Sequence, residues 1–364
     1  MQSNKMQSNK MSIHKNGLAA AALLGLAAVL TGCGHGSGSG GGTGTMGGGA
    51  PAVTPAIGGS PGTLEIAVIP KGTSHEYWKS IHAGALKAQQ ELKAKGTNID
   101  VLWKGTERED DRNGQVTIVE TFVTQKVNAI VLAPLDSTAL ATPVHDAAGH
   151  KIPVVIIDSG LNGSDWVSFD ATDNEKGGEL GGERLGQLLN GKGKVLLLPY
   201  AQGSASTEAR ETGFLSAMKK FPGITLLSTN QYGGPTTDSA YKTSENLLTR
   251  YGAQTDGVFA SNETNTRGMR LALKDKGLLG KVKFVGFDAA PDLVQALGAK
   301  ELQGLVVQNP FKMGYTGVMT AVDAAQGKPV AKTIDTGVAL VTPETLKDPK
   351  LQDFLNPPID QYLK

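Results

Sequence analysis

Residues 154–158 have the sequence VVIID, four β-branched apolar side chains followed by a carboxylate. A strand that is covered by helices on both faces has such a continuous apolar run, and the parallel sheets of α/β proteins are covered in this way. Similar runs occur along the chain at 64–70, 99–103, 129–133, 167–169, 194–199, 225–228, 257–260, 282–287 and 305–308. Each of these runs is therefore predicted to be a strand.

Helical patterns lie between the predicted strands. They cover residues 78–95, 111–125, 138–148, 176–189, 205–219, 237–251 and 265–276. Alternating strands and helices predict doubly wound parallel sheets. The roughly 300 residues after position 62 exceed what one hydrophobic core usually serves. We therefore expect an α/β fold with two doubly wound parallel-sheet lobes.

Polar or aromatic side chains follow the ends of many predicted strands. They are Lys71, Asp158, Tyr200, Asn262, Asp288 and Gln308. His75, Tyr77 and Trp78 stand at the start of the first helix. A single such residue is more often a turn or cap residue. Because ligands of open α/β sheets bind outside the carboxyl ends of the strands, their repetition in both halves predicts a polar binding crevice.

The N-terminal residues have the order of an export signal. A polar stretch with Lys15 precedes an uncharged run at 18–30, and the only cysteine, Cys33, follows in the sequence LTGC. LTGC resembles the lipobox of bacterial lipoproteins, whose cysteine is lipidated and becomes the new N-terminus. We expect 1–32 to be a signal peptide, with 1–10 (MQSNK written twice) ahead of the true start. An ordinary secretory signal with an incidental cysteine is the alternative.

The composition narrows the classes of partner. The chain has 35 Lys and Arg against 34 Asp and Glu, so no basic face for nucleic acid is expected. One cysteine allows no internal disulfide. Residues 33–62 hold the anchor cysteine and a stretch rich in Gly, Ser, Thr and Pro, which cannot bury enough apolar surface to offset its ordering entropy. We expect this stretch to be a flexible linker.

From about residue 63 to the end, the chain resembles the periplasmic sugar-binding proteins of ABC transporters, in the ribose-binding-like group. The resemblance rests on AVIPKGTSHEYWKSIHAGA, IVLAPLD, IPVVIID, ATDNEKGG, GSASTEARETGF, DGVFASNE, VGFDAAPD and GLVVQNPFKMG. It implies the type I periplasmic-binding-protein fold, in which two lobes close about a three-segment hinge on a sugar or polyol. It also implies that the closed form is presented to a membrane permease.

The resemblance implies that nine side chains contact the ligand: Lys71, His75, Tyr77, Trp78, Asp158, Arg210, Asn262, Asp288 and Gln308. Tyr77 and Trp78 match rings that stack on sugar faces, and Asp158 matches a carboxylate that pairs with ring hydroxyls. Independently of the resemblance, carboxylate, amide and guanidinium groups supply the acceptors and donors that hydroxyls need. An aromatic ring can also cover the apolar C–H face of a sugar.

Two departures from the ribose-binding pattern bear on the ligand. The pattern has an arginine where this chain has Ser159, and a small polar residue where it has Lys71. Ribose is therefore not transferred. A pentose, hexose, polyol or disaccharide fits the residue types, and Lys71 with His75 leaves room for an acidic sugar. Tyr232 lies near a further aromatic position of the family, but the insertion at 233–235 leaves its place open.

Other classes of protein fit less well. No HExxH, no P-loop and no nucleophile elbow on a strand–helix turn is present, so an enzyme is not expected. Glycines 177, 178, 181 and 182 lie inside a predicted helix, which indicates close packing instead of a dinucleotide site. Six scattered histidines predict no metal site. The charged stretch 107–112 is predicted to be a solvated loop that enters a helix.

A transcription regulator of this fold would need a helix-turn-helix where the export signal stands. A sensor that feeds a chemoreceptor or kinase, or a binder of a non-sugar solute, remains an alternative. We expect a monomer without cofactors, lipid-anchored in the periplasm or on the outer face of the cell envelope. The expected boundaries are 63–171 plus 309–333 for the first lobe, 172–308 plus 334–364 for the second, and hinge crossings near 171–173, 308–309 and 333–335.

Overall fold

The computed structural model describes residues 62–363, so the expected export signal and the lipid attachment at Cys33 lie outside the described residues. Within this part of the chain, no helix is both long and apolar enough to cross a membrane. The described residues form two lobes, each built on one six-stranded sheet.

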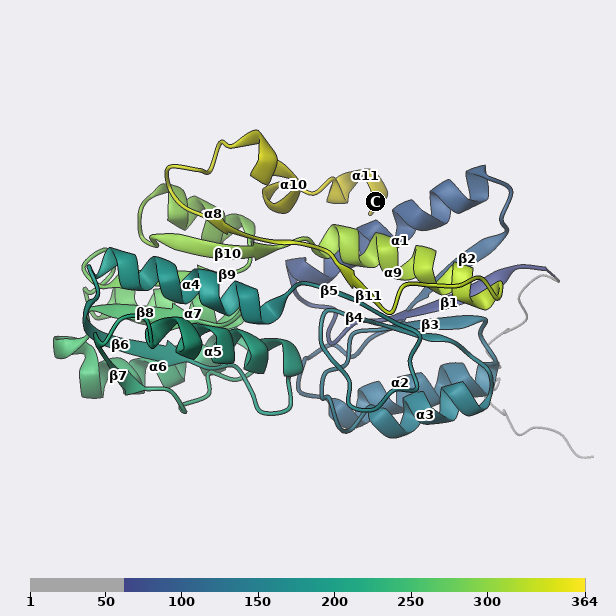
Figure 1. The fold of residues 1–364 in the computed structure, drawn as a ribbon, viewed down its shortest axis with the longest axis horizontal. Helices are drawn as coiled ribbons and strands as arrows, with labels where there is room; N and C mark the ends of the chain where they lie inside the picture. Colours follow the sequence, from purple (N-terminus) through teal and green to yellow (C-terminus); the bar gives the residue numbers. More distant parts are fainter. Residues whose placement is uncertain (1–61, 364) are drawn as a thin grey trace, which may run out of the picture. The chain divides into compact units, whose positions relative to one another are not determined.

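The first lobe is built on a sheet in which every neighbouring pair of strands is parallel (Figure 1). Its strands are β1 (Leu64–Ile69), β2 (Ile99–Trp103), β3 (Ala129–Leu132), β4 (Val154–Ile157), β5 (Ser168–Ala171) and β11 (Thr333–Asp335). Their order across the sheet is β11-β5-β4-β3-β1-β2. The edge strand β11 therefore comes from a distant part of the chain.

Helices cover both faces of this sheet. They are α1 (Glu76–Ala94), α2 (Arg112–Gln125), α3 (Ala141–Gly149) and α9 (Pro310–Ala325). Residues of β1 alternate between the faces: Ile66 and Val68 pack with α1 and α9, whereas Ala67 and Ile69 pack with α2 and α3. All four are fully buried, which explains why the strand has a continuous apolar run.

The second lobe repeats this plan. Its strands are β6 (Lys192–Leu198), β7 (Gly223–Ser228), β8 (Gly257–Ala260), β9 (Lys283–Phe287), β10 (Gly304–Gln308) and β12 (Val338–Val341), in the order β12-β10-β9-β8-β6-β7. The strands are parallel except β12, which pairs antiparallel with β10. Val338, the first residue of β12, pairs with Gln308, the last residue of β10, because the chain re-enters this sheet where β10 leaves it.

Five long helices cover the second sheet. They are α4 (Asn174–Leu188), α5 (Ala205–Met218), α6 (Thr237–Tyr251, followed by the 3-10 turn η1, Gly252–Gln254), α7 (Glu263–Asp275) and α8 (Pro291–Gly298). Leu185 of α4 and Phe214 of α5 pack on one face, and Leu248 of α6, Met269 of α7 and Leu293 of α8 on the other. The sequence pattern did not identify α8, α9, β11 or β12.

In each lobe, two helices approach each other through glycines. In the second lobe, a Cβ on Gly178 of α4 would lie 2.7 Å from the carbonyl carbon of Arg210 in α5, and one on Gly213 of α5 would lie 2.9 Å from that of Glu175. Glycines of α1 and α9 make the equivalent approach in the first lobe. The prediction that the glycines within 176–189 serve close packing is confirmed.

The chain crosses between the two sheets three times. The crossings are at 172–173 from β5 to α4, at 309 from β10 to α9, and at 336–337 from β11 to β12. The expected third crossing at 333–335 needs a correction, since these residues form β11 and pair with β5 of the first sheet. The chain leaves the first lobe only after residue 335.

The C-terminal tail contacts both lobes. It forms η2 (Pro349–Leu351), α10 (Gln352–Leu355) and α11 (Ile359–Tyr362). Leu355 is buried in the core of the second lobe, whereas α11 packs on α1, with the Tyr362 ring 5.7 Å from the Phe311 ring. The expectation that 334–364 belongs wholly to the second lobe is therefore wrong for its last residues.

Candidate functional site

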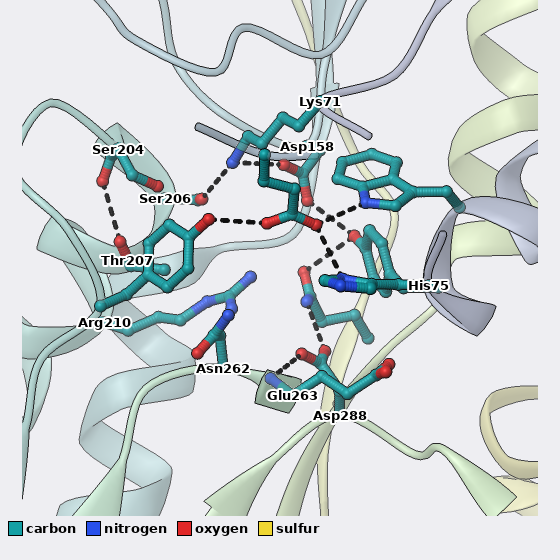
Figure 2. A pocket seen from close by; sticks show the side chains of 15 residues that line it. Lys71, His75, Asp158, Ser204, Ser206, Thr207, Arg210, Asn262, Glu263 and Asp288 are labelled. Carbon is teal, nitrogen blue, oxygen red and sulfur yellow. Dashed lines mark hydrogen bonds and ion pairs between the residues drawn. The ribbon is translucent and has the colours of Figure 1, made fainter. Parts of the chain in front are cut away.

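A polar pocket lies where the carboxyl ends of strands from the two lobes face each other (Figure 2). Its lining residues are Lys71, His75, Tyr77, Trp78, Glu109, Asp158, Tyr200, Ser204, Ser206, Thr207, Arg210, Asn262, Glu263, Asp288 and Gln308. All nine side chains singled out from the sequence are among them. Parallel strands end at one edge of a sheet, so residues that follow strand ends converge there.

Asp158 follows β4 directly and organises the first-lobe wall. Its carboxylate lies 2.9 Å from the Lys71 ammonium and accepts a 2.7 Å hydrogen bond from the Tyr77 hydroxyl. Lys71 also donates to the Ser206 hydroxyl of the second lobe over 3.2 Å. Asp158 has a φ of 62°, a left-handed conformation that aspartate tolerates better than most residues. The charge of Lys71 is thus neutralised within the protein.

Asp288 follows β9 in the same manner, with a φ of 72°. Its carboxylate accepts a 2.7 Å hydrogen bond from the Gln308 side-chain amide and a 2.9 Å bond from the backbone N–H of Glu263. Burial raises the pKa of Asp288, and the nearby charge of Arg210 acts against that rise. Asp288 therefore joins the ends of three elements, β9, β10 and α7.

Arg210 is a buried cation of the second-lobe wall, with 3% of its surface exposed. Its Nε donates to Asn174 Oδ1 over 2.8 Å and its Nη1 donates to the Ser261 carbonyl oxygen over 3.1 Å. The guanidinium lies 3.9 Å from the centre of the Phe287 ring. These contacts fix the plane of the guanidinium at the pocket, where its donors form a rigid fork.

Glu109 is the exception in the stretch 107–112, whose other residues are exposed as predicted for a solvated loop. Its carboxylate is buried and accepts hydrogen bonds from Trp78 Nε1 (2.6 Å) and from the Tyr200 hydroxyl (2.7 Å), and it lies 2.9 Å from His75 Nδ1. Burial alone would raise the pKa of Glu109, but the hydrogen bond and charge of His75, with the other two donors, lower it. The same pairing raises the pKa of His75 against the opposing effect of burial.

Glu263 is the first residue of α7 and is 4% exposed. Burial raises its pKa to about 7, and the ion pair with Arg267 acts in the opposite direction. Near neutral pH, part of the molecules therefore carry a proton on this carboxyl. Protonated, it can donate a hydrogen bond to a ligand oxygen, and ionised it can accept one from a hydroxyl.

Six lining residues were not among the predicted contacts: Glu109, Tyr200, Ser204, Ser206, Thr207 and Glu263. Tyr200 follows β6 and had the same strand-end signal as Asp158, Asp288 and Gln308. Glu263 follows Asn262, whose Oδ1 accepts the backbone N–H of Asn265 over 3.2 Å as the N-cap of α7, so it looked like an ordinary first-turn carboxylate. Tyr232 does not line the pocket and is 40% exposed.

The lobes are closed on each other. The pocket holds about 40 Å³ of open volume, room for only a few water molecules. Carboxylates, amides, hydroxyls and a guanidinium line it, a set suited to a ligand with several hydroxyls. Across residues 62–363, no group of three or more His, Cys, Asp or Glu side chains is placed to hold a metal ion.

Two α/β lobes joined by three crossings, with a polar pocket between them, define a bilobal solute-binding protein. The family model of the periplasmic binding protein domain matches residues 66–329, and the chain belongs to this family. The predicted resemblance to its ribose-binding-like group and the two-lobed α/β fold are confirmed. The family is one of binding proteins.

Several known proteins are similar over most of this chain. The D-allose-binding periplasmic protein of Escherichia coli (strain K12) is 29% identical over 268 residues, which cover 71% of this chain and 84% of that protein. A structure of a carbohydrate transporter solute-binding protein from Agrobacterium radiobacter, in complex with D-arabinose, is 35% identical with a TM-score of 0.76 and covers 82% of this chain and 100% of that one. An Agrobacterium vitis solute-binding protein with bound D-fucose is 33% identical with a TM-score of 0.76 and covers 80% and 99%.

Proposed function

We propose that the protein captures an uncharged sugar or related polyhydroxy solute between its lobes, outside the cytoplasm, and delivers it to an ABC permease. The observation that carries this proposal is the convergence of the nine predicted side chains, from both lobes, on one buried polar pocket. Similar proteins with D-allose, D-arabinose and D-fucose in their names or structures support a sugar as the ligand.

Each class of lining group has a part in binding. Asp158 and Asp288 accept from hydroxyls, Gln308 and Asn262 both donate and accept, and the fork of Arg210 donates. The rings at Tyr77 and Trp78 meet edge to face with centroids 5.0 Å apart and supply an apolar surface for C–H groups. A ligand that contacts both walls stabilises the closed form because the open form lacks half of those contacts.

The ion pairs of the pocket favour an uncharged ligand. Lys71 and His75 left room for an acidic sugar in the sequence, but Lys71 is paired with Asp158 and His75 with Glu109. A ligand carboxylate at Lys71 or His75 would therefore have to displace a protein carboxylate that is already close to its cation, and the charge of the third cation, Arg210, already acts on the nearby Asp288 carboxylate. Burying a charge without a partner is costly, so we propose that acidic sugars are rejected.

The proposal includes a lipid anchor on Cys33, a location outside the cytoplasm and a monomeric state. The LTGC sequence supports lipidation of Cys33, and the family supports a periplasmic location. We propose that the protein is a monomer. Cys33→Ser should move the protein from the membrane fraction to the soluble periplasmic or secreted fraction. If that variant stays with the membrane, the anchor lies elsewhere.

A thermal-shift screen over neutral monosaccharides, polyols and disaccharides tests the ligand class, with calorimetry on each hit. D-Galactose against D-galacturonic acid, and D-glucose against D-glucuronic acid, are matched pairs that differ in one carboxylate. We expect a hit among the neutral compounds with a micromolar dissociation constant, about −8 kcal/mol, and no shift with the acids. A screen in which only acids bind would refute the charge argument.

A transport role is tested in cells. Deletion of the gene should abolish uptake of the radiolabelled hit while leaving chemotaxis towards it unchanged. Normal uptake with lost chemotaxis would favour the sensor alternative instead.

A further inference from the structure

Glu109 lies in the loop between β2 and α2 and reaches the pocket over Gly72. A Cβ on Gly72 would lie 3.0 Å from the Glu109 Cγ, so glycine leaves the space through which this side chain passes. Two of the donors to its carboxylate, Trp78 Nε1 and His75 Nδ1, belong to the first lobe. Glu109 therefore sets the orientation of two side chains that face the ligand site.

The third donor belongs to the other lobe. The Tyr200 hydroxyl donates to Glu109 Oε2 over 2.7 Å, across the pocket. Tyr200 is itself held in place, since its backbone N–H donates to Glu211 over 3.0 Å and its carbonyl accepts from Gly234 N–H over 2.9 Å. The tyrosine is 4% exposed. A buried hydroxyl and carboxylate are costly to separate unless water reaches both, so this bond resists opening of the lobes.

Other direct bonds cross between the lobes beside it. The Ser206 N–H donates to Ser159 Oγ over 3.0 Å, and the Ser137 N–H donates to the Gly203 carbonyl oxygen over 2.9 Å. These bonds between the lobes themselves stabilise the closed arrangement.

We propose that Glu109 is a positioning residue and an interlobe latch. It holds Trp78 and His75 towards the ligand site and, through Tyr200, stabilises the closed form of the two lobes by a bond that lies within the protein. This inference rests on the proposed function only in treating the pocket as a ligand site, since every contact from which it is argued lies within the protein. The latch sets part of the ligand affinity, because the population of the closed form scales the apparent dissociation constant.

Hydrogen exchange of the ligand-free full chain tests the latch. The amides of Ser137 and Ser206 are bonded across the cleft and become exposed when the lobes part, so their exchange reports opening. Tyr200→Phe removes only the hydroxyl. It should speed exchange of both amides by about tenfold, the change expected when one hydrogen bond to a charged group is lost.

Two tyrosines provide matched controls. Tyr241 donates to Asp275 over 2.9 Å within the second lobe, and Tyr315 donates to Glu91 over 2.8 Å within the first. Tyr241→Phe and Tyr315→Phe should leave exchange at the two amides unchanged. Equal exchange in Tyr200→Phe and the controls would overturn the latch. So would unprotected amides in the parent protein, because the lobes would then not be closed without ligand.

Glu109→Gln tests the positioning role without any ligand. The amide brings its own donors to a place where three donors already point, so at least one contact is lost. NMR titration should show that the pKa of His75 falls in Glu109→Gln and stays unchanged in Tyr200→Phe. A His75 pKa that does not respond to Glu109→Gln would refute the positioning role. If no sugar binds in the separate thermal-shift screen, the proposed function fails. Hydrogen exchange and the pKa of His75 still test the latch and the positioning role in that case, because neither measurement needs a ligand.

Discussion

Gly178→Ala tests whether the α4–α5 contact positions the second-lobe wall of the pocket. The added Cβ would lie 2.7 Å from the carbonyl carbon of Arg210 and 2.8 Å from the backbone nitrogen of Phe214. Ordinary contacts of this kind begin at 3.4 Å and the Arg210 carbonyl oxygen lies closer still than these two atoms, so α4 and α5 must move apart by more than roughly 0.7 Å. All three obstacles are backbone atoms, which cannot rotate away as a side chain would.

The expected cost follows from two opposing effects. Overpacking of a core costs about 1–3 kcal/mol, and an unyielding backbone places this case at the upper end. Alanine gains about 1 kcal/mol over glycine in a helix interior. The net loss in the free energy of unfolding should be about 2 kcal/mol. The same displacement stretches the Arg210 bond to Asn174, so affinity for the sugar identified in the screen should fall as well.

Urea denaturation of the full chain, followed by calorimetry with that sugar, measures both effects. Gly149→Ala is the matched control, because Gly149 lies at the end of α3 with nothing within 4 Å of the added Cβ. This control should be neutral or slightly stabilising and should bind sugar normally. If Gly178→Ala is as stable as Gly149→Ala, the close approach of α4 and α5 is not present in solution.

Three further predictions concern the pocket and its support. Burial raises the pKa of Glu211 to about 7, so the folded state binds more protons than the unfolded state between about pH 4.5 and 7. The stability of the protein should therefore fall as the pH rises through that range. Glu211→Gln should flatten this dependence and stabilise the protein by about 2–3 kcal/mol at pH 8, and an unchanged slope in thermal melts would refute the assignment. Asn262→Ala should lower sugar affinity and also cost about 1 kcal/mol of stability in urea, because Asn262 caps α7; unchanged stability would mean that the cap contributes nothing. Trp78→Phe should remove the fluorescence change on sugar addition, and a signal that persists would have to come from one of the other two tryptophans.

Many of the residues that line the pocket could be predicted because they follow the ends of parallel strands. Strand ends can be recognised from apolar runs such as 154–157, and parallel topology brings whatever follows them to one edge. Asp158, Asp288 and Gln308 all line the pocket for this reason. Arg210 lies within a helix and is not a strand-end residue, so only the family resemblance identified it.

Glu109 shows where sequence reasoning ends. It stands in the run EREDDR, whose alternating charges are the pattern of a solvated loop. Its burial depends on Tyr200, 91 residues away, and on the room above Gly72. No sequence pattern within the loop predicts those contacts. Asp111 in the same run does what the pattern predicts: its side chain accepts the Gly114 N–H and caps α2.

The failure to predict the two strands at the C-terminal end has a topological cause. Thr333–Asp335 and Val338–Val341 are short, and each completes the edge of a sheet whose other strands lie far away in sequence. Strand β12 is also antiparallel to β10, because the chain enters the second sheet at the end of β10 that lies at the hinge. Local patterns were therefore too weak to reveal them.

The two walls of the pocket share one arrangement, an aspartate directly after the third strand of each sheet. Asp158 follows β4 and Asp288 follows β9, each the third strand of its sheet counted from the edge completed by β11 or β12. Both adopt positive φ, and both accept hydrogen bonds from groups beyond their own strand. The repetition extends to the helices, since α1 with α9 and α4 with α5 meet through paired glycines. In each pair, one helix follows the first strand of its lobe, and the other, α9 or α4, follows a crossing. A shift in either pair therefore moves a pocket wall and a hinge segment together, which is why we expect Gly178→Ala to change affinity as well as stability.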